Sequence, residues 1–144
     1  MGSLLISRSP TAMTRAHLRL LLLLISLLLP YAVRLPGGWD WTAQYLTLPP
    51  GAAMFLHGMN ALVWAPLLAL TWLYRDLRWL WLPALVGLGF LAWGQASLDL
   101  ESDAQIGLAV AVLPVIALIP MLIAAVIAWW LDTQRARKLR PNAG

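Results

Sequence analysis

The sequence contains no cysteine and very little charge. Its 144 residues include no Cys, and only 11% are Asp, Glu, Lys or Arg, whereas a soluble domain carries roughly 25%. The lack of Cys excludes disulfide scaffolds, thiolate metal sites and cysteine nucleophiles. The lack of charge excludes a soluble globule, because a chain that is 61% hydrophobic has too little polar surface to present to water. Disorder is excluded as well, since it requires the opposite composition.

Common catalytic motifs are also missing. The chain has no Walker A sequence, no HExxH, no GxSxG and no dinucleotide-binding glycine motif after a soluble strand. Its basic residues fall into three short segments rather than one folded basic domain, which argues against nucleic acid as a partner. We therefore expect a non-enzymatic protein with no cofactor.

Four long apolar stretches remain, and each is close to the roughly 20 residues that cross a bilayer as a helix. They run from 16 to 35, 52 to 73, 79 to 98 and 105 to 131. The sequence predicts an all-α, polytopic membrane protein with four antiparallel transmembrane helices, a flexible tail over 1–15 and a basic tail over 132–144. The first stretch also has the charge and leucine pattern of a signal peptide, but no small-x-small cleavage site follows it, which favours an uncleaved span.

The distribution of charge predicts the orientation. Nine of the ten basic residues fall on one side of the four spans, namely Arg8, Arg15, Arg19, Arg75, Arg78, Arg135, Arg137, Lys138 and Arg140. Arg34 is the exception. Because short cytoplasmic loops are enriched in Lys and Arg, we expect both termini in the cytoplasm. Short loops and richness in Leu, Ala and Arg suit a multi-pass protein of the bacterial inner membrane.

Small residues predict where the helices meet, because helices in lipid approach one another through Gly, Ala and similar side chains. The second span has a stripe at steps of four residues, which includes Ala61, Ala65 and Ala69. The fourth span has another at steps of three or four, which includes Gly107, Ala111, Pro114 and Ala117. We expect spans two, three and four to be closely packed, with the leucine-rich first span at the periphery.

A few polar side chains are predicted to lie inside the membrane near the non-cytoplasmic side. His57 and Asn60 are three residues apart on one helical face, and Gln95 lies at a similar depth in the third span. The loop 36–51 contains a short amphipathic segment, 39–48, from which Tyr45 would cover this site. Intramembrane polar groups of this kind are candidates for ligand binding. The alternative, which we favour, is that they hydrogen-bond the helices together.

The loop between the third and fourth spans carries Asp99, Glu101 and Asp103. Three acids on a short loop are candidate oxygen ligands for a divalent cation. The glycine and spacing of an EF-hand are missing, so a solvated acidic loop is the favoured interpretation and no metal site is expected.

Two functional hypotheses follow. The favoured one is a non-catalytic accessory, assembly or interaction subunit, whose partners are the lipid bilayer and either other membrane protein subunits or a second copy of itself. The alternative is a small oligomeric transporter or channel with a polar site around His57 and Asn60. A small redox or lipid-modifying enzyme using His57 is disfavoured by the lack of Cys and the scarcity of intramembrane acids.

Overall fold

The computed structural model describes residues 14–101 and 104–138, and all regular structure within these residues is helical. In chain order the elements are α1 (Arg15–Ala32), the 3-10 helix η1 (Leu35–Gly37), α2 (Trp39–Leu46), α3 (Pro50–Leu73), the 3-10 helix η2 (Leu77–Leu80), α4 (Trp81–Ser97) and α5 (Ala104–Lys138). Four candidate spans, formed by α1, α3, η2 with α4, and α5, are long and apolar enough to cross a membrane. The predicted helical class and the number of candidate spans are therefore confirmed.

Local sequence explains where several helices begin. The Thr14 hydroxyl accepts the backbone N–H of His17 at 3.3 Å and caps the start of α1. Pro50 occupies the first turn of α3, where its missing N–H costs nothing. Between η1 and α2 the chain turns at Gly38, whose φ of 98° is a conformation that glycine adopts without strain.

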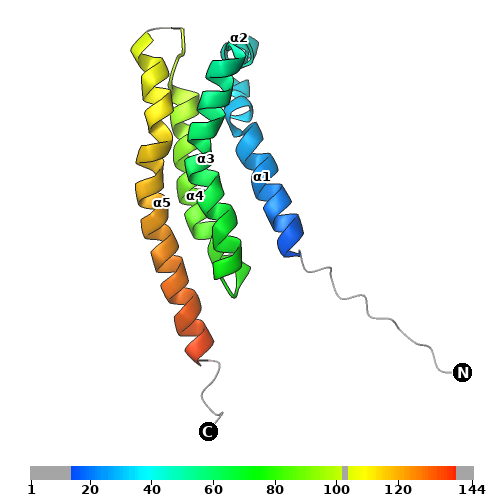
Figure 1. Cartoon of the computed structure of the whole chain (residues 1–144), viewed down its shortest axis with the longest axis vertical. Helices are drawn as coiled ribbons and strands as arrows, with labels where there is room; N and C mark the ends of the chain where they lie inside the picture. Colours follow the sequence, from blue (N-terminus) through cyan, green and yellow to red (C-terminus); the bar gives the residue numbers. More distant parts are fainter. Residues whose placement is uncertain (1–13, 102–103, 139–144) are drawn as a thin grey trace, which may run out of the picture.

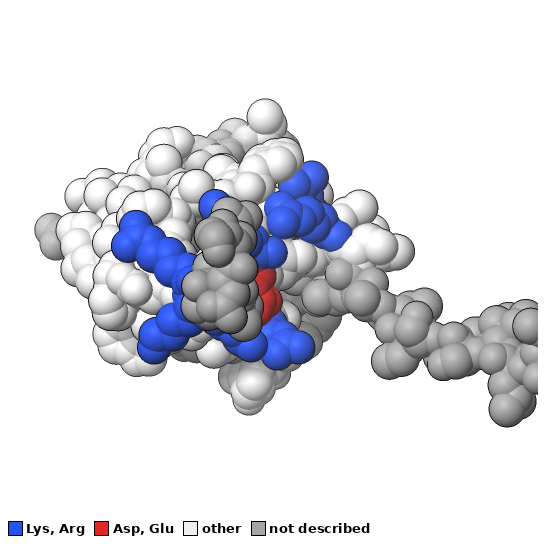
Figure 2. Space-filling view, turned by 90° about the horizontal axis from the view of Figure 1, so that it is seen from below, with Lys and Arg blue, Asp and Glu red and all other residues white. Residues whose placement is uncertain are grey.

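The four long helices run alternately up and down, with α1 and α5 on opposite sides of α3 and α4 (Figure 1). The first described residues of α1 and the last of α5 lie at the same end of the molecule, and α2 lies at the other. We call these the basic end and the α2 end. Figure 2 looks onto the basic end, where Lys and Arg side chains gather.

The predicted fourth span is only part of a longer helix. α5 continues without a break through Pro114 and Pro120 to Lys138. The first half of the predicted C-terminal tail, 132–138, is therefore helical, and its remainder lies outside the described residues. Of the predicted N-terminal tail, only Thr14 and Arg15 are described, and Arg15 already belongs to α1.

Two glycines allow α4 to approach its neighbours closely. A Cβ at Gly87 would lie 2.7 Å from Met121 Sδ and 3.0 Å from Val63 Cγ1, and a Cβ at Gly94 would collide with the Leu113 side chain. Small residues let membrane helices pack at short distance and gain van der Waals contact. Gly87 and Gly94 thus let α4 pack closely against α5, and Gly87 also lets it approach Val63 of α3.

The small residues predicted to line α5 are mostly buried. Ala111, Pro114 and Ala117 face the other helices, followed at helical spacing by Met121, Ala124 and Ala128. Gly107 differs from the prediction, because it is exposed and no neighbouring atom lies within 4 Å of a Cβ built there.

The contact face of α3 also differs from the predicted alanine stripe. Its buried residues are Leu56, Asn60, Val63, Leu67 and Thr71. Ala61 is half-buried, and Ala65 and Ala69 are exposed. Because lipid tails are as apolar as Leu, the spacing of small residues does not by itself identify the inward face. Here the bulkier Val63 and Leu67 fill the space beside α4 and α5.

The outward surface of the long helices is apolar. Leu28 on α1, Leu85 on α4 and Val126 on α5 are 58%, 69% and 64% exposed. Large exposed apolar surfaces are rare on soluble monomers, so this surface suits hydrocarbon.

Candidate functional site

The polar residues predicted to form a site lie together at the α2 end. Asn60 and Gln95 project from α3 and α4 and are both buried. The Tyr45 hydroxyl of α2 is close enough to both for them to affect its ionisation. The rings of Tyr45 and His57 are 6.2 Å apart, centroid to centroid, in an edge-on arrangement. Tyr45 itself is 1% exposed and is packed among the helices.

A buried arginine completes this cluster, and the sequence-based site did not include it. Arg34 follows α1 and has no exposed surface. One guanidinium nitrogen donates to Gln44 Oε1 at 3.0 Å, and the other terminal nitrogen donates to the Leu98 carbonyl at 2.7 Å. Its charged group also lies 5.5 Å from the centroid of the Tyr45 ring. The signal that pointed to Arg34 was its position as the one basic residue on the acid-rich side.

Gln44 joins the two connections at the α2 end. Its Nε2 donates to Asp99 Oδ1 at 2.8 Å, and its Oε1 accepts the backbone N–H of Leu100 at 3.2 Å as well as the Arg34 guanidinium. The amide therefore binds Arg34, which follows α1, and also Asp99 and Leu100, which follow α4. Both polar groups of the Gln44 amide are hydrogen-bonded, the NH₂ group as a donor and the oxygen as an acceptor.

The acidic loop is organised by these contacts. Asp99 Oδ1 also accepts the backbone N–H of Glu101 at 3.0 Å, which forms a local turn. Within residues 14–101 and 104–138, no group of three or more His, Asp or Glu side chains is arranged to hold a metal ion. Asp103, the third predicted ligand, lies outside the described residues.

Tyr31 is a second residue that sequence reasoning missed. Its hydroxyl lies 3.0 Å from His57 Nε2, within hydrogen-bond distance, and its ring packs edge-on against Tyr45 with centroids 5.4 Å apart. Tyr31 lies in the last turn of α1, near Pro30. It thereby connects α1 to α2 through Tyr45 and to α3 through His57.

Not every polar atom of the cluster is hydrogen-bonded. The Tyr45 hydroxyl and both polar atoms of the Gln95 amide are buried without a hydrogen-bond partner among the described residues. Leaving such groups unpaired costs about 1–3 kcal/mol each. Burial raises the pKa of the Tyr45 hydroxyl, and neighbouring polar groups such as Asn60 offset only part of that shift. This hydroxyl is therefore a neutral donor at ordinary pH.

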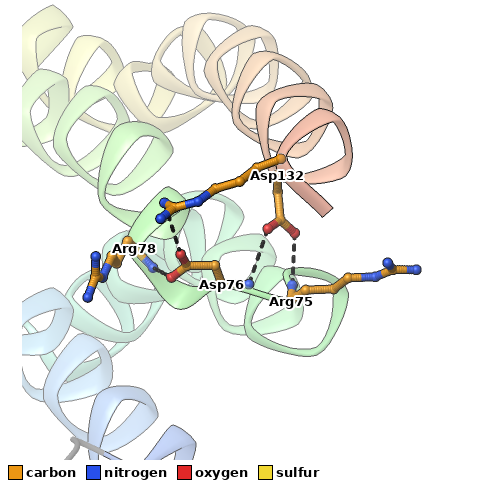
Figure 3. A network of polar contacts seen from close by, with 5 residues as sticks. Arg75, Asp76, Arg78 and Asp132 are labelled. Atoms are coloured by element: carbon orange, nitrogen blue, oxygen red, sulfur yellow. Dashed lines mark hydrogen bonds and ion pairs between the residues drawn. The ribbon is translucent and has the colours of Figure 1, made fainter. Parts of the chain in front are cut away.

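A separate polar network holds the basic end together (Figure 3). Asp132 of α5 is 3% exposed and accepts the backbone N–H groups of Arg75 and Asp76 at 2.9 and 3.2 Å. Asp76 in turn accepts the N–H of Arg78 at 3.0 Å and lies 3.6 Å from the Arg135 guanidinium. The network thus fastens the α3–η2 connection to the last turns of α5.

Tyr74 and Arg15 extend these attachments to neighbouring helices. The Tyr74 hydroxyl donates to the Ala125 carbonyl at 2.9 Å. Burial, with a smaller contribution from the charge of Asp132, raises the pKa of Tyr74 to about 12. Arg15 donates to the carbonyls of Thr71 and Tyr74 at 2.8 and 3.1 Å and so ties the start of α1 to the end of α3.

Comparison of the chain with known protein families, curated proteins and solved structures finds no match in any of the three. The functional interpretation therefore rests on the geometry of the chain itself.

Proposed function

We propose that the chain is a multi-pass protein of the bacterial inner membrane, folded as an antiparallel four-helix bundle with both termini in the cytoplasm. Its proposed role is that of a non-catalytic accessory or interaction subunit. The orientation is supported by the gathering of Lys and Arg at the basic end, because cytoplasmic loops carry the excess of basic residues.

The observation that carries this proposal is how the polar side chains at the α2 end are used. Arg34 binds Gln44 and the Leu98 carbonyl, and His57 lies within hydrogen-bond distance of Tyr31. Each of these contacts joins two different segments of the chain, which are 10 to 64 residues apart in the sequence. Interhelical polar contacts of this kind stabilise membrane helices, so they favour a structural role for these residues.

The outward face of α3 is where we expect a partner helix. Gly58, Ala65 and Ala69 lie on this face and are exposed, and no neighbouring atom lies within 4 Å of a Cβ built at Gly58. Small exposed residues at helical spacing would let another transmembrane helix approach to short distance. The same face would serve either a larger complex or a second copy of the chain.

The test is affinity purification of the tagged full-length chain from its native membrane in mild detergent. We expect one membrane protein, or an untagged copy of this chain, at constant stoichiometry. Ala65→Leu should release that partner because the added side chain stands between the helices. Ala96→Leu is the matched control, since Ala96 is exposed on α4. A monodisperse chain that carries no partner, or equal capture by both variants, would contradict the proposal.

The unpaired polar atoms favour the alternative role of a small transporter or channel. Tyr45 and Gln95 present buried hydrogen-bonding atoms beside Asn60 and near His57, and a translocated polar solute would satisfy them. In this role His57→Ala abolishes flux in proteoliposomes while the helical content is retained. Unchanged flux in that variant would eliminate His57 as part of a transport site.

A further inference from the structure

A cleft opens at the basic end between the start of α1 and the connection from α3 to α4. Its volume is about 510 Å³, and Arg15, Arg75 and Arg78 line it together with Asp76 and Trp81. Arg15 comes from the first turn of α1, whereas the other residues belong to the connection and to the start of α4. The cleft thus brings together arginines that are about 60 residues apart in the sequence.

The cleft has an excess of positive charge. Among residues 14–101 and 104–138, one ion pair has an N···O distance within 4.0 Å, and it joins Arg135 to Asp76. Arg135 does not line the cleft, so the arginines that do line it are not in that ion pair. Arg15 is held by two neutral carbonyl groups, which orient its guanidinium without cancelling its charge. Arg78 is exposed, and Figure 3 shows its side chain pointing away from that of Arg75.

An apolar groove begins where the cleft ends. It has a volume of about 260 Å³ and lies between α1 and α4, and its lining includes Ile25, Leu29, Trp81, Leu85, Gly89 and Ala92. Trp81 lines both the groove and the cleft. From Trp81 to Ala92 the groove extends about 16 Å at 1.5 Å per residue, which is close to half of a hydrocarbon core of about 30 Å. Its length therefore matches one leaflet.

We propose that the cleft and the groove together bind one anionic phospholipid. The phosphate group is held by Arg78 and Arg15 in the cleft, and one acyl chain lies in the groove along α4. Charge complementarity favours an anionic headgroup, because basic recesses between transmembrane helices attract such lipids. The continuity through Trp81 favours a whole lipid over a free phosphate, since the groove offers only apolar contacts.

Native mass spectrometry of the purified full-length chain tests this site. The chain is titrated in mild detergent with dioleoyl phosphatidylglycerol or with dioleoyl phosphatidylcholine, which has the same acyl chains. We expect one phosphatidylglycerol molecule to be retained in preference to phosphatidylcholine. Glycerol phosphate, which has the phosphate without acyl chains, should not displace it. Equal retention of the two lipids, or displacement by glycerol phosphate, would overturn the proposal.

Two pairs of variants locate the lipid. Arg78→Gln should weaken phosphatidylglycerol binding about fivefold, while Arg137→Gln removes an equivalent exposed charge outside the cleft and should leave it unchanged. Gly89→Leu fills the groove without a clash, because a Cβ there meets no atom within 4 Å, and should abolish retention. Gly107→Leu on α5 is its control, since Gly107 is exposed and a Cβ there also meets no atom within 4 Å.

Circular dichroism verifies that all four variants remain helical. If Arg137→Gln weakened binding as much as Arg78→Gln, the basic surface as a whole would be responsible and the cleft would not. If Gly89→Leu retained the lipid, no acyl chain would occupy the groove. Either result would refute a defined lipid site.

Discussion

Among residues 14–101 and 104–138, one charged side chain is buried at each end of the molecule, and the two charges have opposite signs. Arg34 is fully buried at the α2 end, near Asp99, whereas Asp132 is 3% exposed at the basic end. Each end therefore buries the charge that is in the minority there. At the α2 end the opposite charge of Asp99 lowers the cost of burying Arg34, whereas at the basic end backbone N–H groups hold Asp132.

The two buried charges differ in their partners. Asp132 accepts two consecutive backbone N–H groups, which belong to a single connection. Arg34 binds a side chain of α2 and a carbonyl that follows α4, and its Nε is buried without a partner among the described residues. Arg34 consequently joins three segments, whereas Asp132 joins two. We expect loss of the arginine to affect the whole fold and loss of the aspartate to act more locally.

The largest effect is expected for Arg34→Met. This change removes the guanidinium and leaves Gln44 Oε1 and the carbonyls of Trp41 and Leu98 with fewer donors. The free energy of unfolding should fall by about 3 kcal/mol, as measured by denaturant titration of the purified protein in mild detergent. Arg34→Lys retains the charge and should lose about half as much. Stability within about 0.5 kcal/mol of the parent would show that Arg34 is not a structural link.

A smaller effect is expected for Asp132→Ala. The N–H groups of Arg75 and Asp76 lose their acceptor, which should cost about 2 kcal/mol. Hydrogen exchange of these two amides should accelerate while exchange within α4 stays slow. Asp40→Ala serves as the control, because Asp40 is exposed and should contribute little. Equal acceleration throughout the chain would mean that loss of Asp132 affects the whole fold, as is expected for loss of Arg34.

Tyr74→Phe should cost about 1 kcal/mol, because the Ala125 carbonyl loses a donor. The folded state keeps the Tyr74 proton up to a pKa of about 12, whereas an unfolded tyrosine ionises near pH 10. The stabilisation is therefore complete below pH 10 and is lost as the pH rises toward 12. Thermal unfolding across this range should show a steeper decline for the parent than for the variant. Parallel curves would contradict the shifted ionisation.

The smallest effect is expected for Tyr31→Phe. The ring contact with Tyr45 is retained, and only the hydroxyl near His57 is removed. Hydrogen bonds between membrane helices average about 0.6 kcal/mol, so the change in unfolding free energy should be of that order. If Tyr31→Phe lowered the unfolding free energy as much as Arg34→Met, the expected ranking of the contacts at the α2 end would be wrong.

The sequence was a good guide to features that depend on depth along a helix. The spacing of His57 and Asn60, and the matching depth of Gln95, predicted a cluster that the structure brings together. It was a poor guide to which side of a helix faces inward. Ala65 and Ala69 are exposed because the outer surface of a membrane protein is as apolar as its interior, so periodicity carries little information about direction.

Arg34 illustrates a second limit. Its charge was visible as an exception to the basic pattern, but its burial depends on Gln44 and Leu98, which reach it only when α2 folds back and α4 is in place. A contact that depends on three segments at once cannot be read from the spacing within any one of them. The same holds for Tyr31, whose partner His57 is 26 residues away.

The position of Arg34 in the chain also sets an order of events during biosynthesis. Its acceptor Gln44 follows 10 residues later, but the Leu98 carbonyl follows only after 64 residues. At 5–20 residues per second a ribosome needs roughly 3 to 13 s to make that interval. During this time α1 waits with its arginine incompletely bound, so the α2 end closes only after α4 has been inserted. Closure of this end would thus distinguish a chain that already contains α4 from any shorter one.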